Sequence, residues 1–277
     1  MDNHSKELIT RKFHFKLDKV RDRYWLSGSP VKTLHANTLT TGIPFGERFF
    51  VGCLLPYIKT IKCPLLKKNA MEFARQEINH SKEHFKLYLK SVKPFYPNLK
   101  ANGNFYQKIS AVVAFCAGSK IRLAMVAAIE HFTAVAADLY LSHPALFEGA
   151  PKNIVALWHW HFIEEIEHKS VAFDIFKACK GNYVERVVGF FLAGFLLNIA
   201  FLNCYLHMMI YDRLYLSGSF YVESLRYFWG KEGILRHLAK PFLSYLAPNF
   251  HPNNMKEYTS HQDRANRILI IQQQLEQ

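Results

Sequence analysis

The stretch Trp158-His159-Trp160-His161-Phe162-Ile163-Glu164-Glu165-Ile166-Glu167-His168 decides the fold of this 277-residue chain. Within it, Glu165 and His168 stand three residues apart in an uninterrupted helical pattern. Their side chains therefore lie on one helix face, about one turn apart, where a carboxylate and an imidazole can bind the same ion. The same Glu-x-x-His spacing occurs at Glu77 and His80. One copy arises easily by chance in a chain with 14 histidines, but two copies in helical sequence do not.

Each copy follows a single glutamate on an earlier helical stretch. Glu47 lies 30 residues before Glu77, and Glu130 lies 35 residues before Glu165, with 53 residues between Glu77 and Glu130. This order, with a long crossover between two similar halves, is typical of a two-metal carboxylate site in a four-helix bundle of the ferritin-like kind. We therefore predict an all-α fold: a ferritin-like four-helix bundle with additional C-terminal helices. The predicted metal ligands are Glu47, Glu77, His80, Glu130, Glu165 and His168.

The composition agrees with a helical, well-packed protein. Half of the residues are hydrophobic and 15% are aromatic, which excludes a disordered chain and favours deep apolar packing. The five cysteines show no Cys-x-x-Cys spacing, which fits reduced thiols in the cytoplasm better than a disulfide framework. Residues 1–19 are polar and contain no apolar core of a signal peptide. We expect a cytoplasmic protein, with association with a membrane as a further option.

The chain divides into three predicted segments. Residues 1–40 form a polar leader, residues 41–180 form the metal-binding bundle, and residues 181–277 add an apolar helix and shorter C-terminal helices packed on the bundle. In the bundle, proline and glycine positions predict helices over 44–57, 65–92, 105–141 with an interruption near Gly118, and 151–180. An amphipathic tail at 264–275 is expected to cover the bundle or to mediate a homodimer.

Residues 187–211 form an uncharged stretch that is long enough to span a bilayer. Two asparagines, a histidine and two glycines within it favour a core helix or a helix lying against a membrane over a true span. The formal charge of +13 suits an anionic membrane surface or an acidic substrate. A nucleic-acid partner is not favoured, because no recognised binding motif accompanies the charge.

Four carboxylates and two neutral imidazoles balance the charge of two divalent cations. This donor set suits two iron ions, with manganese as an alternative and zinc a poorer match. His84 and His161 fall on the same helix faces as the ligands, so each is a candidate for a catalytic role as an extra ligand, a hydrogen-bond partner or a proton donor. Glu164 and Glu167 lie on other faces, where we expect them to be solvated or paired with cations. The neighbouring Phe and Trp residues form either an apolar pocket or simply core.

The same motifs resemble a known family. The segments Gly46-Glu47-Arg48-Phe49-Phe50, Arg75-Gln76-Glu77-Ile78-Asn79-His80, Glu130-His131-Phe132-Thr133 and 158–174 are similar to those of bacterial predicted metal-dependent hydrolases. That family resembles a branch of the ferritin-like di-iron proteins, alongside ribonucleotide reductase small subunits and arylamine oxygenases. The resemblance covers about residues 40–180, with an extension over the rest of the chain as a further option, and implies the same six ligands.

Three functions follow from these observations. The first is an oxygen-activating di-iron oxidase or oxygenase, whose partners would be dioxygen and an apolar small molecule. The alternative is a metal-dependent hydrolase, in which the cations activate water. The third is a non-catalytic metal-binding or membrane-associated protein.

Overall fold

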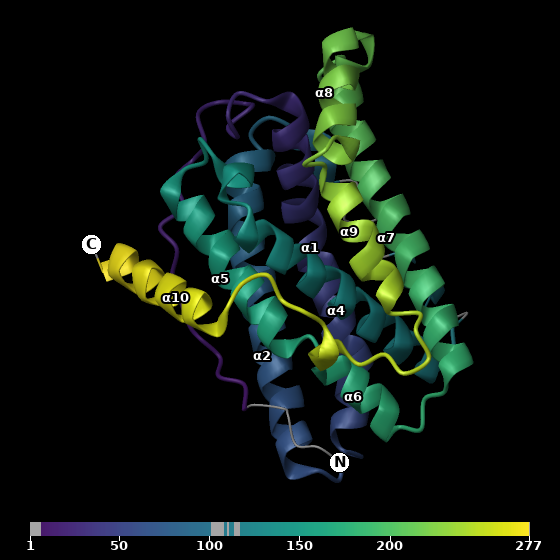
Figure 1. Ribbon diagram of the computed structural model, residues 1–277. Helices are drawn as coiled ribbons and strands as arrows, with labels where there is room; N and C mark the ends of the chain where they lie inside the picture. Colours follow the sequence, from purple (N-terminus) through teal and green to yellow (C-terminus); the bar gives the residue numbers. More distant parts are fainter. Residues whose placement is uncertain (1–6, 101–107, 110, 114–116, 277) are drawn as a thin grey trace.

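The protein is all-α, as predicted, with no strand among the residues that its computed structural model describes, which are 7–276 apart from 101–107, 110 and 114–116 (Figure 1). The chain enters as an extended segment and then forms long helices. The first half contains α1 (Pro30–Ile58), α2 (Pro64–Leu87) followed by a π-helical turn at Tyr88–Val92, and α4 (Ser119–Ser142). The second half contains α5 (Lys152–His168), α6 (Val171–Ala178), α7 (Tyr183–Tyr211), α8 (Gly218–Trp229), α9 (Ile234–Ser244) and α10 (His261–Glu276).

Helices α1, α2, α4 and α5 enclose the interior of the molecule. α1 contacts α2, α2 contacts α5, α5 contacts α4, and α4 contacts α1, so the four helices close a ring. These are the helices that carry the predicted ligands, and their inward faces supply most of the buried polar residues. The arrangement explains how residues more than one hundred positions apart in the sequence reach one place.

The helix over 44–57 was predicted to begin near Pro44, but α1 begins at Pro30, inside the segment predicted to be a polar leader. Ser29 caps α1 by accepting a hydrogen bond from the Lys32 backbone N–H at 3.1 Å, and Pro30 occupies the first helical turn. Val31 and Leu34 are fully buried, so the packing of this face stabilises the helix on both sides of Pro44.

The single helix predicted over 151–180 is two helices. α5 ends at His168, two residues form a turn, and α6 begins at Val171. At this turn Lys169 forms an ion pair with Glu257 at 2.5 Å, which joins the end of α5 to the C-terminal segment. Part of the helix predicted over 105–141 lies outside the described residues, and its second half is α4.

The C-terminal helices pack around the ring. α7 and α9 lie along α4, α8 reaches α1, and α10 contacts α5 and extends away from the bundle on the side opposite α7 (Figure 1). The contact between α4 and α7 is close: a Cβ added to Gly189 would lie 2.6 Å from the Cβ of Ala124. Asn182 and Glu185 form a capping box that starts α7.

Within the described part of the chain, two helices are long and apolar enough to cross a membrane, α4 and α7. Of the most apolar 18-residue stretch of α4, 78% is buried inside the protein, as expected of a core helix. Of the most apolar 18-residue stretch of α7, only 22% is buried. The interpretation of 187–211 as a buried core helix is therefore wrong, because only one face of α7 packs on the bundle.

Candidate metal centre

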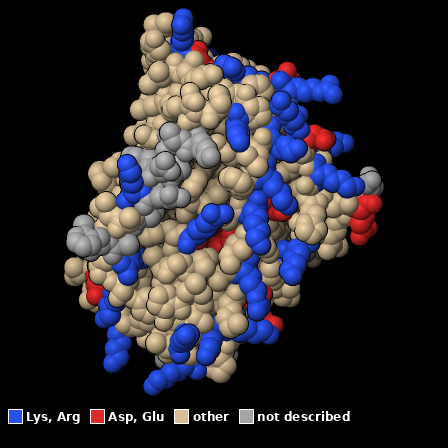
Figure 2. All heavy atoms as spheres, turned by 180° about the vertical axis from the view of Figure 1, so that it is seen from behind, with Lys and Arg blue, Asp and Glu red and all other residues tan. Residues whose placement is uncertain are grey.

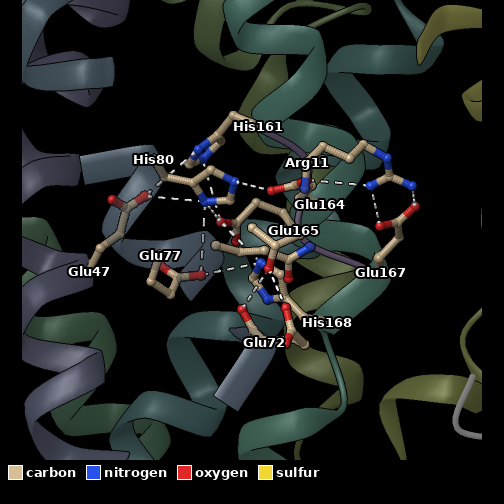
Figure 3. A network of polar contacts seen from close by, with 12 residues as sticks. Arg11, Glu47, Glu72, Glu77, His80, His161, Glu164, Glu165, Glu167 and His168 are labelled. Atoms are coloured by element: carbon tan, nitrogen blue, oxygen red, sulfur yellow. Dashed lines mark hydrogen bonds and ion pairs between the residues drawn. The ribbon is translucent and has the colours of Figure 1, made fainter. Parts of the chain in front are cut away.

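The ring of helices brings the six predicted ligands into its interior. Glu47 comes from α1, Glu77 and His80 from α2, Glu130 from α4, and Glu165 and His168 from α5. All six residues are buried, and none of them is more than 3% exposed. Figure 3 shows Glu47, Glu77, His80, Glu165 and His168 pointing toward one another.

Their ligand atoms form two overlapping groups, each able to hold one ion. The first group contains Glu47, His80, His161 and Glu165, and the second contains Glu77, His80, Glu165 and His168. Within each group the ligand atoms lie within 4.8 Å of one another. His80 and Glu165 belong to both groups. The two carboxylate oxygens of Glu165 could serve both, whereas His80 would serve one of them through Nδ1, because its Nε2 is bonded to Glu164. His161, which the sequence places beside the site as a catalytic candidate, is a member of the first group.

The His80 ring is oriented by contacts on both sides. Its Nδ1 lies 3.8 Å from Glu47 Oε1, 4.0 Å from Glu77 Oε1 and 3.7 Å from Glu165 Oε1. Its Nε2 donates to Glu164 Oε2 at 3.0 Å. One ring nitrogen therefore faces the acidic centre while the other is held by a carboxylate, which is the usual arrangement of a metal-binding histidine.

His168 is oriented in the same way by a different carboxylate. Its Nδ1 donates to Glu130 Oε2 at 2.9 Å, and its Nε2 lies 3.2 Å from Glu77 Oε1. Glu130 is thus placed behind His168 and belongs to neither ligand group, although its Oε1 has no hydrogen-bond partner. A direct ligand role for Glu130 stays a prediction.

The buried atoms fit metal ions well, because many of them lack any other partner. Buried polar groups are normally hydrogen-bonded. At this site the atoms without a hydrogen-bond partner are both carboxylate oxygens of Glu47 and of Glu77, one oxygen each of Glu130 and Glu165, Nδ1 of His80 and of His161, and Nε2 of His168. Cations would satisfy these atoms, which face inward from four helices.

The charges lead to the same conclusion. Burial, reinforced by the neighbouring carboxylates, raises the pKa of Glu47 and of Glu77 well above the usual range, and burial alone does so for Glu130. Burial raises the pKa of Glu165 to about 7, although His168 opposes the shift. Burial also lowers the pKa of His80 well below its usual value. These carboxylates are costly to keep ionised without cations.

Glu164 was predicted to lie on another helix face, either solvated or paired with a cation. It is paired with a cation, and it is not solvated. It is fully buried, and besides His80 it accepts a hydrogen bond from the Arg11 backbone N–H at 3.3 Å. The Arg11 guanidinium binds Glu164 at 3.4 Å and Glu167 at 2.7 and 2.8 Å (Figure 3). The prediction of a salt bridge for Glu167 is confirmed. Arg11 was missed, because no local pattern connects the extended N-terminal segment to α5.

Three histidine rings, those of His80, His161 and His84, follow one another in contact and form a line of histidines, with His84 at its far end. The His84 ring lies 4.7 Å from the His161 ring and 4.5 Å from the Trp158 ring, and both of its nitrogens are buried without a hydrogen-bond partner. The His161 ring in turn lies 4.4 Å from the His80 ring. His84 belongs to neither ligand group, so its position suits a proton carrier better than a ligand.

Aromatic rings surround the site and exclude water from it. Trp160 contacts His80 edge to face at 4.7 Å, and Phe73 contacts His168 in the same way at 4.8 Å. Beyond Trp158 lies a small cavity of about 10 Å³, bounded on its other sides by His35, Tyr140 and Tyr227 among others. Most of the aromatic residues near the ligands are thus core, with one narrow space beside them.

Fold and site together define the class of the protein: an all-α protein with buried groups of glutamates and histidines that could hold metal ions. The comparison with protein families agrees, because the model of the predicted metal-dependent hydrolases matches residues 9–256. The chain belongs to this family. Besides residues 40–180, the match includes the segment with Arg11 and the helices α7 to α9, in agreement with the wider of the two expected extents. Neither the curated proteins nor the solved structures give a match.

Proposed function

We propose that this protein is a two-metal hydrolase whose reaction takes place at the line of histidines between His80 and His84. The observation that carries the proposal is the pair of overlapping ligand groups that share Glu165 and His80. The family description supports this hydrolytic alternative over the oxygen-activating reaction that the sequence favours first. When bound, two divalent cations would lower the pKa of a water molecule and polarise the bond to be cleaved.

The protein residues would position and protonate the reactants. Glu164 holds the Nε2 proton of His80 and so fixes which nitrogen faces the centre. His161 and His84 lie in ring contact, and burial lowers the pKa of both well below the usual value. Neutral imidazoles can accept a proton at one nitrogen and release one from the other. We assign the transfer of a proton at the site to His84, which belongs to neither ligand group, and we assign to His161 the holding of an ion beside it.

A second candidate is the oxygen-activating di-iron reaction on an apolar small molecule. It is favoured by a donor set of glutamates and histidines, which suits iron, or manganese, better than zinc. The aromatic enclosure formed by Trp160 and Phe73 would also protect a reactive species from water. We infer iron as the first choice for the metal under either reaction.

One experiment separates the two reactions. The purified protein is freed of metal, reloaded with iron, manganese or zinc, and assayed without oxygen on chromogenic carboxylic esters and phosphodiesters. Turnover that needs metal and is lost in Glu165→Ala supports the hydrolase. The hydrolase is rejected if no substrate is cleaved without oxygen while the iron-loaded protein consumes oxygen in the presence of an apolar substrate. His84→Asn should slow turnover while two metal ions stay bound.

A further inference from the structure

The outward face of α7 is apolar along its whole length. Val184, Phe191, Phe195, Leu202 and Ile210 are all exposed, and their spacing places them on one side of the helix. Phe195 is 62% exposed and Ile210 is 59% exposed. α8 continues this surface with Leu225 and Trp229, which are 64% and 59% exposed. Exposed apolar surface of this extent indicates a binding site.

The polar groups of this surface are compatible with an apolar environment. No Asp, Glu, Lys or Arg occurs from Val187 to Tyr211. The exposed Asn198 donates its side-chain N–H to the Gly194 carbonyl oxygen at 2.8 Å, so this N–H does not need water as a partner. Tyr183 stands exposed at one end of α7, and Tyr211 and Tyr215 stand exposed at the other. Tyrosines at both ends of an apolar stretch are typical of the boundary between lipid tails and headgroups.

Charged side chains are few on this part of the surface. In Figure 2 the upper left, where α7 and α8 lie when the molecule is seen from behind, is largely free of charge, and lysines and arginines gather over the remainder. The segment that follows α7 is basic: Arg213, Arg226, Lys231, Arg236 and Lys240 are exposed. Of its three acidic residues, Glu232 is exposed, Glu223 is half-buried, and the buried Asp212 side chain pairs with Arg23. With a net charge of +13, two copies of the chain repel each other, whereas anionic headgroups attract it.

We propose that the outward face of α7, together with α8, binds a lipid bilayer by inserting into its apolar layer, with α7 lying parallel to the membrane surface. A helix of 29 residues is about 43 Å long, which would be enough to span the hydrocarbon core instead. Spanning is excluded by the neighbours of α7. α1 contacts both α7 and α2, so a spanning α7 would carry the exposed Lys82 and Lys86 of α2 into hydrocarbon.

Vesicle flotation of the full chain tests this surface independently of the reaction at the metal centre. Vesicles of phosphatidylcholine and phosphatidylglycerol at a ratio of 3 to 1 are compared with vesicles of phosphatidylcholine alone. The wild-type protein should float with both and more completely with the anionic vesicles. The double variant Phe191→Glu/Phe195→Glu should lose about tenfold in partitioning, because two charges face the hydrocarbon.

The matched control is Leu269→Glu/Ile270→Glu on α10, which also places two glutamates at exposed apolar positions, on the opposite side of the bundle (Figure 1). It should float like the wild-type protein, and unchanged metal content and thermal midpoint show that each variant is folded. The proposal is overturned if the wild-type protein does not float or if both double variants lose binding equally. It is also overturned if Phe191→Glu/Phe195→Glu converts a dimer to a monomer in light scattering without changing flotation, since the face would then bind a second copy.

Discussion

Replacing Glu164 should weaken metal binding without unfolding the protein. Glu164 Oε2 accepts the Nε2 proton of His80 at 3.0 Å, and the opposite nitrogen, Nδ1, faces Glu47, Glu77 and Glu165. Losing such a partner of a metal-binding histidine costs about 10- to 100-fold in metal affinity. That range equals about 1.4 to 2.7 kcal/mol.

The two ends of this range correspond to two variants. In Glu164→Gln the amide oxygen still accepts the Nε2 proton but carries no charge, so we expect a loss of about tenfold. Glu164→Leu also removes the acceptor and should lose about 100-fold. Burial raises the pKa of Glu164 to about 7, so the ionised carboxylate is costly at this position and a neutral amide of the same shape avoids that cost. The metal-free Glu164→Gln protein should therefore melt at the same temperature as wild type or higher.

Competition with a coloured chelator measures the affinity, and thermal melting of the metal-free protein measures the fold. Glu167→Gln is the control, because Glu167 binds the same Arg11 guanidinium but is not a hydrogen-bond partner of His80. Its metal affinity should stay within about twofold of wild type. Equal affinity in Glu164→Gln and wild type would refute the reasoning, and so would an equal loss in Glu167→Gln.

Three further predictions concern a buried histidine, the ligands of the metal centre and the contact between α4 and α7. Burial lowers the pKa of His35 from 6.5 to about 4, so His35 takes up a proton at a higher pH in the unfolded chain than in the folded protein. The contribution of neutral His35 to the unfolding free energy is therefore fully present above pH 6.5 and is lost as the pH falls toward 4. At pH 5 this loss is about 2 kcal/mol. In His35→Gln the unfolding free energies measured by denaturation at pH 7 and pH 5 should therefore differ by about 2 kcal/mol less than in the wild-type protein. Glu165→Ala should leave no bound metal, whereas His161→Ala should leave one ion, as measured by metal analysis after dialysis, because Glu165 belongs to both ligand groups and His161 to the first group alone. Gly189→Ala should lower the unfolding free energy by about 1 to 3 kcal/mol through overpacking against α4, whereas Gly194→Ala, with no atom within 4 Å of the new Cβ, should raise it by up to about 1 kcal/mol.

Each of these has an outcome that contradicts it. If the unfolding free energy of His35→Gln depends on pH as in the wild-type protein, His35 is not the group responsible. Retention of two ions in Glu165→Ala would show that the two groups do not share this ligand. Equal stability of Gly189→Ala and Gly194→Ala would show that α7 and α4 are not in close contact.

The helical fold and much of the metal centre could be predicted from the sequence, because the ligands repeat at helical spacing. The positions of Glu77, His80, Glu165 and His168 follow from two short motifs on long helices. Their partners could not be predicted in the same way. Glu164 is directly next to a ligand in the sequence and faces a different one, His80 of another helix, so only the packing of α2 against α5 reveals its role.

The start of α1 was misjudged for a related reason. Pro44 is a strong local signal for a helix start, but the burial of residues from Val31 onward outweighs it. Arg11 carries no signal at all, since an arginine in an extended segment is ordinary until its distant partners are known. Local patterns thus point to the candidate ligands, while contacts between distant segments decide how these side chains are held.

Glu130 and His131 are consecutive residues that face different structures. Glu130 binds His168 inside the centre, while the His131 Nε2 donates to the carbonyl oxygens of Pro241 and Phe242 in α9, at 3.1 and 3.2 Å. One turn of α4 therefore carries both the contact to α9 and the hydrogen bond that orients His168. A coloured or paramagnetic ion in the centre would accordingly act as a built-in reporter, whose spectrum registers events at the outer helices.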